Sequence, residues 1–162
     1  MRIHRLVVAL GSVFSIGMGA VRAQAQTATQ TVTFSVVPMS RAAVSAFAGP
    51  IVVSTASAGA PTSASMGGSS YAITTNETNQ KISAALDAPM PSGVSLAVSL
   101  AAPAGAASTG SMTLGTAAAD VVTGISAVSA TSLPIVYKLS ASSTAVVAAG
   151  TRTVTFTIVA GQ

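Results

Sequence analysis

Apolar and polar residues alternate with a period of two in most of the informative windows of this chain. In VSLAVSL (94–100), valine or leucine occupies every second position, and KISAALD (81–87) and IVYKLS (135–140) alternate in the same way. This pattern is typical of antiparallel strands that turn one face to a core and one to water. The side chains expected to face the core are Val94, Leu96, Val98, Leu100, Ile82, Ala84, Leu86, Ile135, Tyr137 and Leu139.

Turn-forming residues separate these windows. TNETN (75–79) follows YAIT (71–74) and predicts a tight hairpin turn into the strand that begins at Lys81. Prolines and glycines punctuate the rest of the chain, and we expect shorter strands near 51–55, 111–114 and 121–128. No window after the first 25 residues indicates an amphipathic helix.

Two nearly identical stretches lie at the two ends of this strand-rich region. TVTFSVV (31–37) and TVTFTIV (153–159) both carry three alternating apolar side chains. These triplets are Val32, Phe34 and Val36 in the first stretch and Val154, Phe156 and Ile158 in the second. The segments between them do not repeat each other, so we interpret the two stretches as the first and last strands of one sandwich.

Seven to nine short strands with regular turns predict an all-β fold. We expect a single antiparallel β-sandwich of immunoglobulin type over residues 26–162, with a closed barrel as the alternative. The low charge and high apolar content favour a folded domain over a disordered chain.

The first 25 residues have the features of a secretory signal peptide. Two arginines precede an apolar run from Leu6 to Met18, and Ala23-Gln24-Ala25 forms an A-x-A cleavage site. Val21-Arg22-Ala23 is a second candidate, so cleavage is expected after Ala23 or Ala25. The run is shorter than the roughly 20 residues of a membrane span. We therefore expect residues 1–25 to be removed, with no retained anchor, and the protein to be secreted to the periplasm, the cell surface or the medium.

Charge and missing residue types narrow the function. The full chain has a formal net charge of +4, but three of its seven basic residues lie in the predicted signal peptide. The remainder is nearly neutral and has no basic cluster, which argues against nucleic-acid binding. The chain has no cysteine, and its single histidine, His4, lies in the signal peptide. Disulfides, thiolate catalysis, histidine-based triads and the usual zinc sites are therefore excluded from the mature protein.

The carboxylates offer little for acid–base chemistry. The chain contains three, Glu77, Asp87 and Asp120. Glu77 and Asp87 flank one predicted strand, so they should lie roughly 30 Å apart at strand rise. We interpret all three as solvated loop residues, and we predict no catalytic, cofactor-binding or metal-binding residues, no cofactor and no enzyme activity.

Hydroxyl side chains alternate opposite the two apolar triplets. Every second residue from 27 to 35 and from 151 to 157 carries a hydroxyl group, and all of these residues are threonine except Ser35. Threonine suits an exposed strand face, which explains the rows through β-propensity alone. The alternative is a flat hydroxyl array that binds a regular surface such as ice or a polysaccharide.

The strand-only pattern, the signal peptide, the few charges and the abundance of serine, threonine, alanine and glycine together resemble secreted bacterial surface domains of the immunoglobulin-like or pilin-like kind. This general resemblance implies an exported structural or adhesive protein that associates with itself or with other surface proteins. A carbohydrate- or surface-binding module is the alternative. Such modules usually display aromatic platforms, whereas at least four of the five aromatic residues after the signal are expected in the core.

A pilin-like assembly also raises the question of where the first strand goes. The 31–37 segment can close its own sandwich or complete that of a neighbour, because an unpaired sheet edge accepts any suitable strand. We expect the 31–37 segment to close its own sandwich, since the similar stretch at 153–159 already provides the chain with an equivalent strand.

Overall fold

The structure, a computed structural model, describes residues 29–47, 49–54, 59–60, 62–146 and 149–162. The predicted signal peptide and its cleavage sites lie outside these residues. The chain divides into two units, Met1–Ser35 and Val36–Gln162. No helix long and apolar enough to cross a membrane occurs in the described ranges.

The described residues contain strands and no helix. The strands are β1 (Ser40–Val44), β2 (Thr62–Thr75), β3 (Gln80–Leu86), β4 (Val94–Leu100), β5 (Ala107–Ser108), β6 (Met112–Thr113), β7 (Ala119–Ile125), β8 (Val128–Ala141) and β9 (Val154–Ala160).

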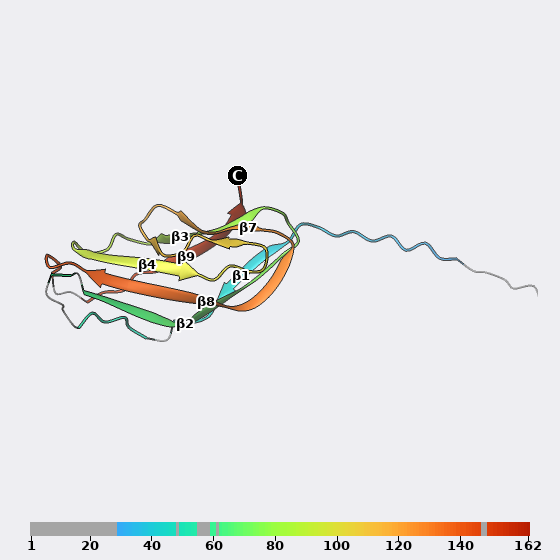
Figure 1. Cartoon of the computed structure of the whole chain (residues 1–162). Coiled ribbons are helices and arrows are strands. Elements are labelled where there is room, and N and C mark those ends of the chain that lie inside the picture. Colours follow the sequence, from blue (N-terminus) through green and yellow to red (C-terminus); the bar gives the residue numbers. More distant parts are fainter. Residues whose placement is uncertain (1–28, 48, 55–58, 61, 147–148) are drawn as a thin grey trace, which may run out of the picture. The chain divides into compact units, whose positions relative to one another are not determined.

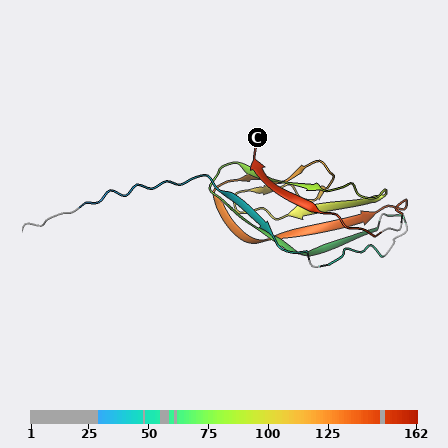
Figure 2. The ribbon, with the colours of Figure 1, turned by 180° about the vertical axis from the view of Figure 1, so that it is seen from behind.

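These strands form two antiparallel sheets, as predicted. One sheet has the order β1-β2-β8-β4-β6 and the other has the order β5-β7-β3-β9. Figure 1 shows the two sheets stacked face to face, and Figure 2 shows the same layers from behind. No assigned pairing joins an edge strand of one sheet, β1 or β6, to an edge strand of the other, β5 or β9. The described strands therefore form an open sandwich and not the alternative closed barrel.

A single apolar core lies between the sheets. Its buried members come from β2, β4 and β8 of the first sheet and from β3 and β7 of the second, together with Leu114 directly after β6 (Met112–Thr113). The predicted inward faces are largely confirmed: Leu96, Val98 and Leu100 are buried in β4, and Ile135 and Tyr137 are buried in β8. The period of two therefore identified the core-facing side of these strands correctly.

The predicted hairpin at 75–79 is wrong. β2 and β3 belong to different sheets, so these residues carry the chain across the sandwich and do not pair two neighbouring strands. The Thr75 side chain stabilises the backbone at this crossing, because its Oγ1 accepts from the Glu77 amide at 3.1 Å. The strand expected at 51–55 is also wrong where it is described, because residues 51–54 belong to no strand.

The strand expected at 31–37 is the main disagreement with the sequence analysis. Residues 29–39 form no strand, and the first strand of the sandwich is β1, which begins at Ser40. The matching stretch at the other end is confirmed as a strand, because β9 covers Val154–Ala160. The two similar stretches, 31–37 and 153–159, therefore have different structures.

Candidate functional site: an apolar groove beside strand β9

Strand β9 lies at an edge of its sheet and has one strand partner among the described residues. It pairs with β3 in the register Leu86 to Val154 and Ala84 to Phe156. The Thr153 carbonyl accepts from the Asp87 amide at 3.1 Å, so the backbone of Thr153 faces β3. Because successive residues of a strand point their backbone groups to opposite sides, the N–H and C=O groups of Val154 and Phe156 face away from β3.

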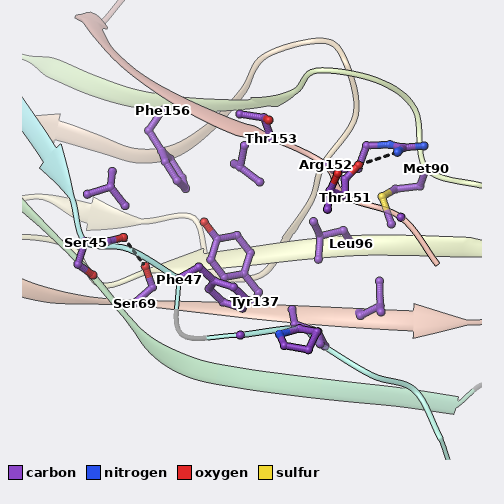
Figure 3. Close-up of a pocket in the computed structure, with 17 residues that line it drawn as sticks. Ser45, Phe47, Ser69, Met90, Leu96, Tyr137, Thr151, Arg152, Thr153 and Phe156 are labelled. Carbon is purple, nitrogen blue, oxygen red and sulfur yellow. Dashed lines mark hydrogen bonds between the residues drawn. The ribbon is translucent and has the colours of Figure 1, made fainter.

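An open cavity of about 730 Å³ lies beside this edge. Figure 3 shows that its walls come from both sheets, with Leu96 and Tyr137 on one side and Phe156 on the other. We call this cavity the β9 groove. It is lined by Val44, Ser45, Phe47, Gly49, Pro50, Ile51, Ser69, Met90, Leu96, Tyr137, Leu139, Gly150, Thr151, Arg152, Thr153, Val154 and Phe156.

Aromatic side chains contribute much of the apolar wall. The rings of Phe47 and Tyr137 meet edge to face, with centroids 5.2 Å apart and an interplanar angle of 85°. Burial raises the pKa of the Tyr137 hydroxyl, which keeps this wall uncharged. Phe47 is 41% exposed and Phe156 is half-buried, so part of the apolar surface of the groove is in contact with water.

The polar groups of the groove are mostly engaged with the protein itself. At one end, the Arg152 guanidinium donates to the Pro89 carbonyl through Nε at 3.0 Å and Nη2 at 2.8 Å. At the other end, Ser45 Oγ accepts from the Ser70 amide at 2.8 Å. Arg152 is the single charged residue among the described residues that line the groove, so the walls of the groove are largely uncharged.

The N-terminal segment 29–39 carries exposed apolar side chains. Val32 and Val36 are each 72% exposed and Phe34 is 85% exposed. The expectation that Phe34 belongs to the core is therefore wrong. Large apolar residues exposed at alternating positions are a feature of interaction sites.

Asn76 holds the chain where the segment meets the sandwich. Its Oδ1 accepts from the Met39 amide at 2.7 Å, and its Nδ2 donates to the Val37 carbonyl at 2.9 Å. The Asn76 amide also donates to the Met39 carbonyl at 3.1 Å. These contacts fix Val37 and Met39 at the start of β1.

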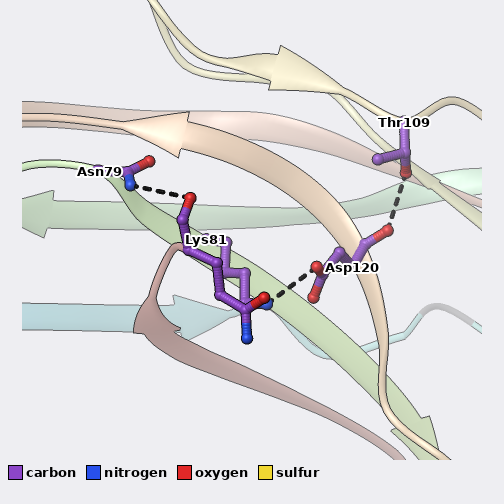
Figure 4. Close-up of polar contacts among 5 residues, drawn as sticks. Asn79, Lys81, Thr109 and Asp120 are labelled. Atoms are coloured by element: carbon purple, nitrogen blue, oxygen red, sulfur yellow. Dashed lines mark hydrogen bonds and ion pairs between the residues drawn. The ribbon is translucent and has the colours of Figure 1, made fainter.

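The three carboxylates occur in three separate contacts. Glu77 accepts from Gln80 Nε2 at 2.6 Å, and Asp87 Oδ1 accepts from the Thr153 amide at 3.0 Å. Asp120 forms an ion pair with Lys81 at 3.0 Å, as Figure 4 shows. The loop assignment is wrong for Asp120, which lies in β7.

The two threonine rows differ in structure from each other, as the two apolar triplets do. Thr151, Thr153, Thr155 and Thr157 are exposed along β9 and the residues before it. The first row belongs to a segment that forms no strand where it is described, and Thr27 lies outside the described residues. A flat array built from both strands is therefore not formed.

Within the described ranges, no group of three or more histidine, cysteine, aspartate or glutamate side chains is placed to hold a metal ion. Comparison of the chain with known protein families, with curated proteins and with solved structures finds no match.

The alternation of apolar and polar residues did not predict the β9 groove. The two similar stretches, 31–37 and 153–159, were a sequence signal for this groove, because a chain with two similar strand-like stretches need not use both of them in its own sandwich.

Proposed function

We propose that this chain is an exported structural or adhesive subunit, non-catalytic and self-associating, which acts at the cell surface or outside the cell. One observation carries the proposal: the chain combines an apolar groove, at an edge of β9 that no described strand pairs with, and an exposed, uncharged segment of strand-like sequence. Both features are suited to association by strand addition.

The order of the strands supports an immunoglobulin-like topology. That fold places strands A, B, E and D in one sheet and C, F and G in the other. In this chain β1, β2, β8 and β4 follow the order A-B-E-D, and β3 and β9 occupy the positions of C and F. In this correspondence β9 is the last of the described strands, and the G position next to it has no described strand.

Export rests on the N-terminal sequence. The basic start, the short apolar run and the A-x-A site are the features that signal peptidase requires. Mass spectrometry of the protein from culture medium or a surface fraction should find an N-terminus at Gln24 or Gln26. A mature protein that still begins at Met1 in the membrane fraction would contradict export.

The structural role is tested by electron microscopy of material sheared from native cells, with antibody labelling of this chain. We expect labelled filaments or a labelled surface matrix. Label found only on dispersed single molecules would contradict a structural role.

A carbohydrate-binding module is the second candidate, and one observation favours it. The β9 groove contains exposed aromatic surface at Phe47, next to Tyr137. Aromatic side chains with a few polar groups are the usual lining of a small-molecule site. Binding to a glycan array that is abolished by Phe47→Ala would support this candidate, provided that the variant keeps its fold by circular dichroism.

A further inference from the structure

We propose that residues 31–37 of one copy bind in the β9 groove of a second copy. The segment adds a strand to the free edge of β9, and Val32, Phe34 and Val36 enter the groove. This inference rests on the proposed function, since it names the contact by which the subunits associate.

The side chains of the segment match the groove. TVTFSVV contains no charged residue, and neither do the groove walls apart from Arg152, which is held by the Pro89 carbonyl. The segment also repeats the alternation of β9, whose Val154 and Phe156 already pack against the core. A strand with this pattern offers three apolar side chains over roughly 13 Å at strand rise.

The backbone of the segment is equally suited to this role. The N–H and C=O groups of Val154 and Phe156 that face away from β3 need partners once water is displaced from the edge. Residues 31–37 contain no proline, so residues 31–36 can each offer both a donor and an acceptor to a ladder, while the Val37 carbonyl already accepts from Asn76 Nδ2. Pro38 follows directly and lacks an N–H group, which ends the ladder at Val37.

The added strand takes a position that the strand order leaves vacant. In the correspondence with the immunoglobulin order, G pairs with F on the side away from C. The edge of β9 that has no described partner strand is that side. A segment from a second copy therefore completes the sandwich where the described strands of the first copy end.

The length of the chain argues against insertion into the same copy. Asn76 holds Val37 at the start of β1, whereas Val44, at the end of β1, lines the rim of the groove. Val37 and Val44 are seven residues apart, which is about 23 Å along an extended chain. Phe34 is three residues from Val37 and reaches at most about 11 Å. Phe34 cannot enter the groove of its own copy while Asn76 keeps its contacts.

The absence of cysteine from the chain allows a direct test. Single-cysteine full-length variants are secreted and purified, then mixed in pairs and oxidised, and mixed disulfide dimers are resolved by non-reducing electrophoresis. The inward donor positions are Val32→Cys, Phe34→Cys and Val36→Cys, and Thr33→Cys is the outward donor. The inward acceptor is Val154→Cys, and Thr155→Cys is the outward acceptor.

Facing side chains on neighbouring strands lie within about 5.5 Å and can form a disulfide, whereas side chains on opposite faces cannot. We expect at least one inward donor to crosslink strongly with Val154→Cys, and Thr33→Cys to crosslink with Thr155→Cys. Thr33→Cys with Val154→Cys should stay unlinked. Crosslinking that ignores the faces, or none in any pair, would overturn the inference.

A second variant keeps the test independent of disulfide geometry. Phe34→Asp places a charge in the apolar groove, so it should abolish assembly while leaving the unfolding curve of the monomer unchanged. Its matched control, Thr33→Asp, should assemble. If Phe34→Asp assembles like the natural chain, the inference is wrong.

The outcomes separate this inference from the proposed function. Labelled surface assemblies with no face-dependent crosslinking would contradict the strand contact and leave the structural role standing. A chain that neither crosslinks nor forms assemblies on native cells would contradict both.

Discussion

Residues 31–37 and 153–159 have nearly the same side chains, yet only the second stretch is part of a sheet. β9 has a partner strand for its whole length, in seven consecutive pairs with β3. Its inward side chains also meet a core built by other strands. The first stretch has neither a described partner strand nor burial, and Phe34 is 85% exposed. Strand-forming sequence therefore becomes a strand only where an edge and an apolar surface are available to it.

The same substitution in the two stretches should have opposite consequences. Phe156→Ala removes an aromatic ring packed against the core and should lower the free energy of unfolding by about 3 kcal/mol, the lower end of the range for buried aromatics because Phe156 is half-buried. Phe34→Ala should change it by less than about 0.5 kcal/mol, as for an exposed site. Urea unfolding of dilute, monomeric protein measures both. Equal losses would mean that the first stretch is also packed in the monomer.

Tyrosine titration distinguishes the core from the segment in another way. Tyr71 is buried in β2 and donates to the Ala101 carbonyl at 2.5 Å, and burial raises its pKa from 10.0 to about 12. A tyrosine introduced by Phe34→Tyr should titrate near the ordinary pKa of about 10. Ultraviolet absorbance of tyrosinate follows both. If the introduced tyrosine titrates together with Tyr71, the exposure of the segment is contradicted.

The raised pKa of Tyr71 also predicts how stability depends on pH. The pKa is higher in the folded than in the unfolded chain, so the contribution is complete below about pH 10. It is lost as the pH rises from 10 toward 12, because the unfolded chain releases its proton first. Tyr71→Phe should flatten this part of the stability curve, as measured by urea unfolding at a series of pH values. An unchanged slope would assign the alkaline loss to other groups.

The junction between the two regions depends on Asn76. Asn76→Ala removes the two side-chain hydrogen bonds to Val37 and Met39, so it should destabilise the monomer by about 1–2 kcal/mol. Thr78→Ala, in the same turn and exposed, is the control and should be nearly neutral. The measurement is thermal unfolding followed by circular dichroism. A neutral Asn76→Ala would show that these bonds do not hold the start of β1.

The smallest effects are expected on the outward faces. Thr155→Ala and Thr33→Ala both change exposed hydroxyl-bearing side chains, so each should alter the free energy of unfolding by less than about 1 kcal/mol. Urea unfolding of the two variants measures this. A large loss for Thr155→Ala would mean that the faces of β9 are assigned the wrong way round.

The sequence was sufficient to predict the strands that bury one complete face. β4 has the predicted bounds, 94–100, and its inward leucines are buried, because a period of two leaves one choice of face. It could not predict Val121 and Val122, which are consecutive and both buried. The pairing of β7 with β3 shifts register at this point, and such a bulge breaks the alternation.

The two larger errors have a common cause. The turn residues 75–79 indicate that the chain reverses but not whether the next strand joins the same sheet. The apolar triplet of 31–37 likewise specifies a strand with one buried face without specifying whose edge it joins. The groove was missed for the same reason, since its wall is assembled from residues as distant as Leu96 and Phe156. Local patterns describe strands well and describe their partners poorly.

Deletion of residues 26–37 tests the central claim, that the first stretch is not part of the sandwich of its own copy. The truncated chain retains β1 and all later strands. It should therefore unfold cooperatively, with a loss of only about 1 kcal/mol because the Asn76 bond to the Val37 carbonyl is removed. It should fail to assemble, and a peptide of residues 26–37 should bind it. The same peptide with Phe34→Asp is the control and should not bind. A truncated chain that loses its fold would contradict the account, because the first stretch would then be a strand of its own sandwich.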